Sequence, residues 1–314
     1  MLKLPKLRIG DKIARIPIIQ GGMAVRLSTA RLAAAVANQG GIGLIAASGL
    51  RMEELRYEIR LARALTKGII GINIMVAATR FAEAVKTAIA EGIDLVVAGA
   101  GFSRDMFGLG KESGTPIVPI VSSVKLAKIS QRLGASAIVV EGKEAGGHLG
   151  TAESIKKLIP AIRQAVDLPI VAAGGIINGK EIAEMIRMGA NGVQMGSRFA
   201  ASEESNAAPA LKEFYLKSTP EDVVVIHSPV GLPGRAIRSP FAERVMKGPV
   251  PPKICDGCLK ACKHNFCIIR ALVRAEQGDV ETGLVFTGEN IHRIQEILPV
   301  QKIFENLLTE AAAV

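Results

Sequence analysis

The amino-acid sequence predicts a (β/α)₈ barrel of the TIM type, an α/β fold of eight parallel strands and their connecting helices, with a smaller lobe inserted near its end. Three observations predict this fold. Short apolar runs alternate with helix-like stretches from the start of the chain to about residue 200, the runs number eight, and each connection is long enough for a crossover helix. The 314 residues suffice for one barrel and a smaller lobe, and they fit two equal domains less well.

The eight expected strands are almost continuously hydrophobic, which is typical of strands that are covered on both faces. They span residues 16–21, 42–47, 69–76, 94–98, 116–122, 137–141, 169–173 and 192–196. Eight strand-helix units of about 25 residues each favour a closed barrel over an open, doubly wound sheet.

The helices expected between the strands carry apolar residues three and four positions apart. Examples are residues 79–91, 124–133, 154–165 and 180–188. Gly92, Gly134 and Gly189 follow three of these helices, where a left-handed C-terminal cap favours glycine.

The strand-helix rhythm breaks after Ala200. We therefore expect residues 1–200 to form the barrel. Residues 201–284 are rich in proline and contain all four cysteines, which indicates an inserted substrate or lid lobe. Residues 285–314 regain a helical pattern and would return to the barrel as its last outer helix.

The formal net charge of +10 could attract nucleic acid, anionic lipid or acidic ligands over long range, and an ordinary basic surface is the alternative. Lys and Arg are scattered and the few aromatic residues are not interleaved with them, so we expect small acidic molecules, a coenzyme A ester or an acyl carrier protein rather than nucleic acid. No apolar run is long enough for a signal peptide or a membrane helix, which predicts a cytoplasmic protein. A homodimer is the candidate assembly, although the sequence does not determine the oligomeric state.

Glycines lie at the ends of the last two expected strands, the pair Gly174-Gly175 after the seventh and Gly196, with Ser197 beside it, at the eighth. Glycines let backbone amides approach an anion, and the loops after strands seven and eight form the common phosphate cup of such barrels. Tight turns would use the same residues, but the two turns together favour phosphate binding.

Two further strand ends could lie along an extended ring. Gly21, Gly22 and Met23 follow the first strand, where the backbone could lie flat against a ring, although a simple turn explains them equally well. Asn73, on the third strand, has an amide that could pair with the donor and acceptor edge of a flavin pyrimidine ring.

The sixth strand runs into a glycine-rich segment that contains a histidine. His148 is flanked by Gly146, Gly147 and Gly150, so we expect an exposed imidazole at the reactive face, able to act as acid, base or hydrogen-bond donor. Gly146, Gly147 and Glu141 are candidate cofactor contacts. A solvated loop histidine is the alternative.

The four cysteines, Cys255, Cys258, Cys262 and Cys267, are spaced much like ligands of zinc or of an iron-sulfur cluster. Reduced structural thiols or a redox-active dithiol are the alternatives. In the neighbouring segment 228–235, Arg235 could be a cation beside the substrate or an ordinary surface arginine.

The chain resembles the nitronate monooxygenase (2-nitropropane dioxygenase) family, which includes the flavin-dependent enoyl-acyl carrier protein reductases. The resemblance covers nearly the whole chain and rests on QGGM at residue 20, GIN at 71, EGKEAGGHLG at 141, PIVAAGGI at 169, MGANGVQMGSRF at 188 and the closing EILPVQKIFENL. It implies FMN, with Gly174, Gly175, Gly196 and Ser197 at the phosphate, Gly21, Gly22, Met23 and Asn73 along the ring system, and His148 as the active-site histidine. NAD(P)H would deliver hydride at the open face of the flavin.

The resemblance implies an FMN-dependent NAD(P)H oxidoreductase that reduces an activated double bond, as in an enoyl thioester. Oxidation of alkyl nitronates with oxygen is the alternative within the family. Two other classes remain, a flavin-free isomerase barrel that uses the cup for a substrate phosphate, and a non-catalytic metal- or redox-sensing barrel. The cysteine cluster departs from the better-known members of the family. It is consistent with an oxygen-poor habitat, where an oxygen-consuming reaction is disfavoured, and so it favours the reductase.

Overall fold

A computed structural model describes residues 4–23 and 25–314 of the chain. Its centre is a closed barrel of eight parallel strands, which confirms the predicted (β/α)₈ barrel. In chain order the strands are β3 (Ile18–Gln20), β4 (Ile42–Ala46), β5 (Ile69–Met75), β6 (Leu95–Gly99), β7 (Ile117–Val121), β8 (Ile138–Glu141), β10 (Ile170–Ala173) and β11 (Gly192–Met195). Pairing of β11 with β3 closes the barrel, with Val193 opposite Ile18 and Met195 opposite Gln20.

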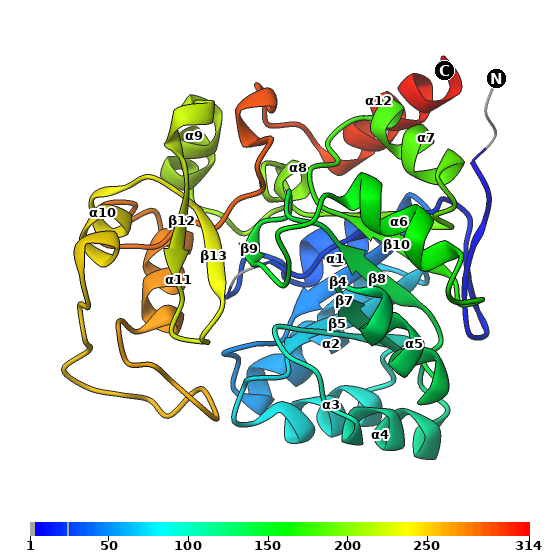
Figure 1. The fold of residues 1–314 in the computed structure, drawn as a ribbon, viewed down its shortest axis with the longest axis horizontal. Helices are drawn as coiled ribbons and strands as arrows, with labels where there is room; N and C mark the ends of the chain where they lie inside the picture. Colours follow the sequence, from blue (N-terminus) through cyan, green and yellow to red (C-terminus); the bar gives the residue numbers. More distant parts are fainter. Residues whose placement is uncertain (1–3, 24) are drawn as a thin grey trace.

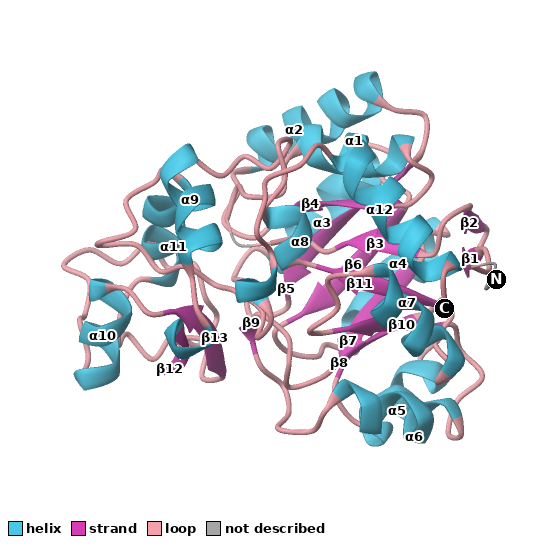
Figure 2. Ribbon diagram, turned by 90° about the horizontal axis from the view of Figure 1, so that it is seen from above, coloured by secondary structure: helices cyan, strands magenta, loops and turns pink. Residues whose placement is uncertain are grey.

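The barrel strands lie inside a ring of helices (Figure 2). These are α1 (Ala30–Asn38), α2 (Met52–Leu65), α3 (Phe81–Ala90), α4 (Asp105–Ser113), α5 (Val124–Arg132), α6 (Ile155–Arg163), α7 (Gly179–Arg187) and α12 (Val300–Ala312). The predicted helix-ending glycines Gly92, Gly134 and Gly189 have φ angles of +76°, +87° and +106°, as a left-handed cap requires. Helix α12 packs against α7 and α1 and so completes the ring.

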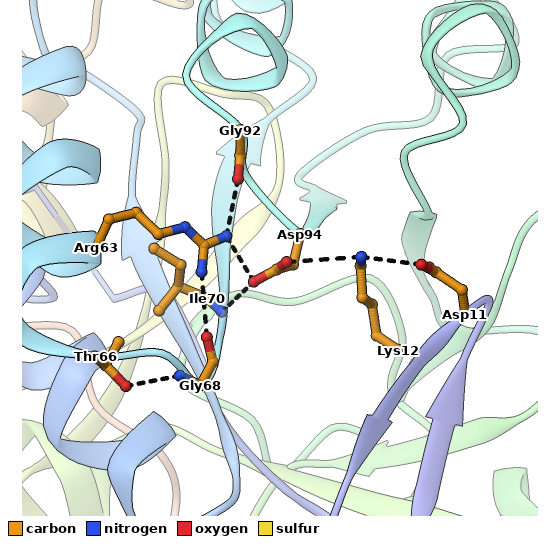
Figure 3. Close-up of polar contacts among 8 residues, drawn as sticks. All are labelled: Asp11, Lys12, Arg63, Thr66, Gly68, Ile70, Gly92 and Asp94. Atoms are coloured by element: carbon orange, nitrogen blue, oxygen red, sulfur yellow. Dashed lines mark hydrogen bonds and ion pairs between the residues drawn. The ribbon is translucent and has the colours of Figure 1, made fainter.

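One end of the barrel is closed by an antiparallel hairpin of β1 (Leu7–Ile9) and β2 (Lys12–Ala14). Its side chains Leu7, Ile9 and Ala14 are buried against the barrel interior. Asp94, at the start of β6, fixes this end by accepting hydrogen bonds from Arg63 at 2.7 Å and from the Ile70 backbone N–H at 2.9 Å (Figure 3). Lys12 of β2 lies 3.8 Å from the same carboxylate, so the hairpin, α2 and two barrel strands share one polar network.

Residues 201–284 contain a second group of elements, which lies to one side of the barrel in both views (Figure 1, Figure 2). They are α9 (Pro209–Lys217), β12 (Val223–His227), β13 (Pro233–Ile237), α10 (Pro240–Lys247) and α11 (Ile268–Glu276). β12, β13, α10 and α11 share a hydrophobic cluster in which Phe241, Phe266 and Leu272 are buried. Helix α9 packs through Leu211 and Tyr215 in a second cluster, which also contains Leu27 of the barrel part. No helix among the described residues is both long and apolar enough to cross a membrane.

The segment that carries His148 is not the free loop that the sequence suggests. Gly147 and His148 form a two-residue strand, β9, which pairs with β13. Gly234 lies opposite His148 and Arg235 opposite Gly147, so this part of the barrel is hydrogen-bonded to the hairpin of β12 and β13.

Candidate functional site

A cavity opens at the carboxyl ends of the barrel strands, where barrels of this type carry out their chemistry. It brings together every residue that the sequence suggested for the cofactor and for catalysis. These lining residues are Gly21, Gly22, Met23, Asn73, Glu141, Gly146, Gly147, His148, Gly174, Gly175, Gly196 and Ser197. Tyr215, Leu272 and Phe286, from beyond residue 200, also line it.

One wall of the cavity is formed by the glycines after β3. The space beside them is filled by two amide side chains, because a Cβ on Gly22 would lie 2.2 Å from Asn73 Cβ and one on Gly21 would lie 3.3 Å from Gln194 Cγ. Asn73 also donates a hydrogen bond to the Gly22 carbonyl, at 3.3 Å. These glycines therefore allow Asn73 and Gln194 to line the cavity.

The two amide side chains leave acceptors without partners. Asn73 Oδ1 and Gln194 Oε1 are buried and accept no hydrogen bond from the described part of the chain. Because a buried acceptor without a partner costs about 1–3 kcal/mol, such atoms at a cavity wall indicate a ligand that donates N–H groups. The imide edge of a flavin ring offers such a donor.

A second wall is the glycine cup after β10 and β11. Gly174 and Gly175 have φ angles of +116° and +72°, which expose their backbone without a side chain in the way. The Asn290 amide donates to the Gly175 carbonyl at 2.7 Å, and Ser197 Oγ accepts from the Gly288 backbone N–H at 2.9 Å. The loop around residue 288 thus fixes the cup, and together with the open amide wall this arrangement fits FMN.

Glu141 lies at the end of β8 and faces the same cavity. Burial raises the pKa of its carboxyl group to about 8. The side chain is therefore mostly protonated at neutral pH and can donate a hydrogen bond.

His148 is half-buried, which corrects the expectation of an exposed imidazole with little packing. Its ring meets Phe286 edge to face, with 5.2 Å between the ring centroids, and its Nε2 lies 2.8 Å from Ser228 Oγ. Burial lowers the pKa of His148 to about 4, so the imidazole is neutral at pH 7.

Arg235 supports the histidine segment from β13. Its Nε donates to the Ala145 carbonyl at 3.1 Å and its Nη2 to the Lys143 carbonyl at 2.6 Å. The sequence suggested either a cation beside the substrate or a surface arginine. The side chain is instead only 12% exposed and holds the backbone of the segment that leads to His148.

The cysteine segment lies against the loop that follows β5. Thr79 donates its backbone N–H to the Cys258 carbonyl at 3.0 Å, and Lys260 Nζ donates to the Val76 carbonyl at 2.9 Å. Burial, and then the neighbouring thiols of Cys267, Cys262 and Cys255, raise the pKa of Cys258 to about 11. The thiols are thus neighbours, yet no group of three or more His, Cys, Asp or Glu within residues 4–23 and 25–314 is arranged to hold a metal ion.

Several residues of the site carry no local sequence signal. Phe286 and Asn290, which line the cavity, and Ser228, which contacts His148, follow the last barrel strand by more than 25 residues and come to the site only through tertiary pairing. Gln194 could have been found, because it lies on β11 inside the motif that ends at Gly196 and Ser197.

Comparisons with known proteins agree with this geometry. The family model described as nitronate monooxygenase matches residues 8–310. A probable nitronate monooxygenase of Staphylococcus aureus is 30% identical over an alignment that covers 94% of each chain. A 5-hydroxy-7a-methyl-1-oxo-octahydro-1H-indene-4-carboxyl-CoA dehydrogenase of Mycobacterium tuberculosis is 32% identical over 74% of this chain, but the match spans only 66% of that relative, just under two thirds.

Two solved structures extend the comparison. FabK from Thermotoga maritima superposes with a TM-score of 0.84 at 34% identity, covering 96% of this chain and 94% of that one. A nitroalkane oxidase from Streptomyces ansochromogenes superposes with a TM-score of 0.82 at 24% identity, covering 95% of this chain and 96% of that one. At this identity the match shows the fold alone. With the family model matched over almost its whole length, the chain belongs to the nitronate monooxygenase family, whose members are flavin-dependent oxidoreductases.

Proposed function

We propose that the chain is an FMN-dependent oxidoreductase that uses NAD(P)H to reduce the activated double bond of an enoyl thioester. The observation that carries this proposal is the single cavity in which the glycine cup, the unpartnered amides and the neutral His148 meet. The 34% identity to FabK over most of both chains supports the reductase branch, since flavin-dependent enoyl-acyl carrier protein reductases belong to this family. The apolar side chains of Met23, Leu272 and Phe286 offer a wall for an acyl chain.

Bound FMN would supply the hydride chemistry. The backbone of Gly174, Gly175 and Gly196, with Ser197, would hold its phosphate. Asn73 and Gln194 would pair with the ring edge, one amide oxygen accepting from its single imide N–H and the amide N–H groups donating to its carbonyl oxygens.

Two side chains of the protein, His148 and Glu141, would take part in the reaction. A neutral imidazole can donate its single N–H to the thioester carbonyl oxygen, which stabilises negative charge that develops there. Glu141, as a protonated acid, can donate a second hydrogen bond into the cavity. The residues from beyond 200 exclude water from one side of it.

We propose the division of the chain that its sequence suggests, with a barrel in residues 1–200, an inserted substrate lobe in residues 201–284 and a return to the barrel in residues 285–314. The buried cluster within the lobe supports this division, as do Tyr215 and Leu272, which reach from the lobe to the cavity. The substrate thioester would be carried by coenzyme A or by an acyl carrier protein.

A zinc ion or an iron-sulfur cluster at the four cysteines remains a prediction from their spacing. As placed, the thiols do not fit a bound metal, so the reaction includes no step at this segment. Metal analysis of anaerobically purified protein tests whether zinc or iron is bound at these cysteines.

Oxidation of alkyl nitronates is the second candidate. The name of the matching family model and the full-length similarity to a probable nitronate monooxygenase favour it. An anaerobic assay that offers enoyl thioesters and alkyl nitronates, each with and without NAD(P)H, separates the two activities.

His148→Ala tests the role of the histidine in the proposed reaction. We expect the variant to retain FMN and to accept hydride from NAD(P)H, seen as loss of absorbance near about 450 nm. Transfer to the enoyl thioester should slow by about 10²–10⁴-fold, the usual contribution of a positioned proton donor.

His227→Ala is the matched control, because this histidine is exposed on β12 and does not line the cavity. It should behave as the unaltered protein. A purified protein that neither contains nor binds FMN would contradict the proposed function as a whole.

A further inference from the structure

Ser228 is an almost fully buried serine, 2% exposed, whose hydroxyl meets the proposed active-site histidine. We infer that Ser228 is a positioning residue that fixes the ring orientation and the tautomer of His148. This inference rests on the proposed function for its effect on turnover, but the tautomer itself can be observed without any substrate.

The turn between β12 and β13 fixes the position of the serine. Ser228 N donates to the Leu232 carbonyl at 3.0 Å, and Gly231 N donates to the Ser228 carbonyl at 2.9 Å. Val230 N donates to Ser228 Oγ at 3.3 Å. Backbone hydrogen bonds within this turn therefore hold the Ser228 hydroxyl oxygen in place.

The histidine is brought to this turn by strand pairing. His148 lies opposite Gly234 in the register of β9 and β13, and Leu149 N donates to the Pro233 carbonyl at 2.9 Å. The ring and the hydroxyl thus come from two adjacent parts of the same small sheet. The pairing brings the two side chains close enough for the 2.8 Å contact between Nε2 and Oγ.

The direction of the contact between Ser228 and His148 determines which ring nitrogen carries the proton. Val230 N–H occupies one of the two acceptor sites of Ser228 Oγ, and we assign the hydroxyl proton to the contact with His148 Nε2. An Nε2 that accepts has no proton, which puts the single proton of the neutral ring on Nδ1. No hydrogen bond to Nδ1 comes from the described residues, which leaves this N–H available to a ligand.

This tautomer suits one of the two family reactions better than the other. An Nδ1–H facing a ligand is a hydrogen-bond donor, as polarisation of a thioester carbonyl requires. A base that removes a proton from a nitroalkane would need a lone pair on that nitrogen instead. Ser228 therefore favours the donor role of His148.

The test is Ser228→Ala, with Ser130→Ala as the matched control. Ser130 is also buried and makes one side-chain hydrogen bond, to the Leu126 carbonyl at 2.8 Å, but it lies on α5 away from the cavity. ¹⁵N NMR of histidine-labelled protein reports the protonated ring nitrogen directly. We expect His148 to be protonated on Nδ1 in the unaltered protein and in Ser130→Ala, and to populate Nε2–H in Ser228→Ala.

The same variants are compared in turnover. Ser228→Ala should lower kcat for the enoyl thioester by about 10- to 100-fold, as the loss of an orienting hydrogen bond does at metal-bound histidines, with KM nearly unchanged. Flavin reduction by NAD(P)H should stay at its original rate, and Ser228→Thr, which keeps the hydroxyl, should recover most of kcat.

Failure of this inference is distinct from failure of the proposed function. If Ser228→Ala keeps Nδ1–H and full kcat while His148→Ala is inactive, the role of Ser228 is overturned and the reductase proposal is retained. If His148→Ala is fully active, the reductase mechanism fails, whereas the NMR result still decides whether Ser228 sets the tautomer.

Discussion

Gly22 is the residue at which the cofactor wall tolerates least change. A methyl group there would lie 2.2 Å from Asn73 Cβ and would force the amide out of its place in the cavity. We expect Gly22→Ala to weaken FMN binding by about 1–3 kcal/mol, the typical cost of overpacking, which is about a 5- to 150-fold rise in the dissociation constant. The dissociation constant is measured by titrating FMN-free protein with FMN and recording the flavin fluorescence.

Gly108→Ala is the control for this substitution. A Cβ at Gly108, on α4, meets nothing within 4 Å, so FMN affinity should not change. Equal FMN affinity in Gly22→Ala and the unaltered protein would show that Asn73 does not contact the cofactor.

Glu141 gives the folded protein a specific pH dependence. Burial raises the pKa of its carboxyl group from an ordinary value of 4.5 to about 8. Between these two values the folded chain keeps a proton that the unfolded chain releases, so stability must fall as the pH rises. Above about pH 8 both states are ionised and this loss is complete.

Glu141→Gln should remove this pH dependence. In FMN-free protein, the Tm of the unaltered chain should fall relative to that of the variant by at least about 2 °C between pH 5 and pH 8, the shift that about 1 kcal/mol produces in a domain of more than about 150 residues. Above about pH 8 the difference in Tm between the two proteins should become constant. Parallel Tm curves over the whole range would mean that the carboxyl group is already ionised in the folded state.

The sequence predicts the residues of the site where the signal is local. Glycines at the ends of two successive strands together predicted the phosphate cup, and Gly174, Gly175 and Gly196 line the cavity. Ser228 and Phe286 could not be predicted, because the pairing of β9 with β13 brings them to His148 across about 80 and 140 residues of chain. The same pairing explains why His148 is half-buried rather than exposed.

At the scale of elements, the barrel strands were predictable because both of their faces are buried. β4 is buried at all five positions, so it reads as one apolar run. The sequence analysis did not predict the hairpin of β1 and β2. Each strand has only three residues, and the middle one is exposed, Arg8 in β1 and Ile13 in β2. Such short alternating segments give too weak a periodic signal.

Asp94 connects several elements at the closed end of the barrel. Its carboxylate accepts from Arg63 of α2 and from the Ile70 backbone of β5, and it faces Lys12 of β2 (Figure 3). Asp94→Ala should lower the free energy of unfolding by about 1–3 kcal/mol, because the Ile70 N–H and the Arg63 guanidinium each lose a partner away from bulk water. Chemical denaturation with urea measures this change.

Glu83→Ala serves as the control for this network. The Glu83 carboxylate pairs with Arg80 within one helical turn, and both side chains are about half exposed, at 52% and 53%. Such a surface pair contributes little, so the unfolding curve should hardly move. Equal effects of the two substitutions would show that the network does not tie the hairpin to the barrel.

At the scale of the whole molecule, stability and chemistry lie at opposite ends of the barrel. The hairpin and the Asp94 network close the end at which the strands begin, and the cavity and residues 201–284 lie toward the end at which they finish (Figure 2). Substitutions at the first end should therefore change stability alone, whereas those at the second should change binding and turnover, and at Glu141 also the pH dependence of stability.

The net charge of +10 is a property of the whole chain, and it bears on how the substrate arrives. If the enoyl thioester is carried by an acidic acyl carrier protein, attraction between the two proteins raises the rate of encounter, and salt weakens it. Raising the salt from about 0.1 M to about 1 M shortens the screening length from about 10 Å to about 3 Å. KM for the carrier-bound substrate should then rise by about 10-fold or more while kcat stays constant.

A short, uncharged enoyl thioester is the matched substrate for this experiment. It enters the same cavity but carries no charge for the protein to attract, so its KM should hardly respond to salt. A coenzyme A thioester, with fewer charges than a carrier protein, should fall between the two. If all three substrates respond alike, salt acts on the cavity rather than on encounter, and the basic surface does not select the carrier.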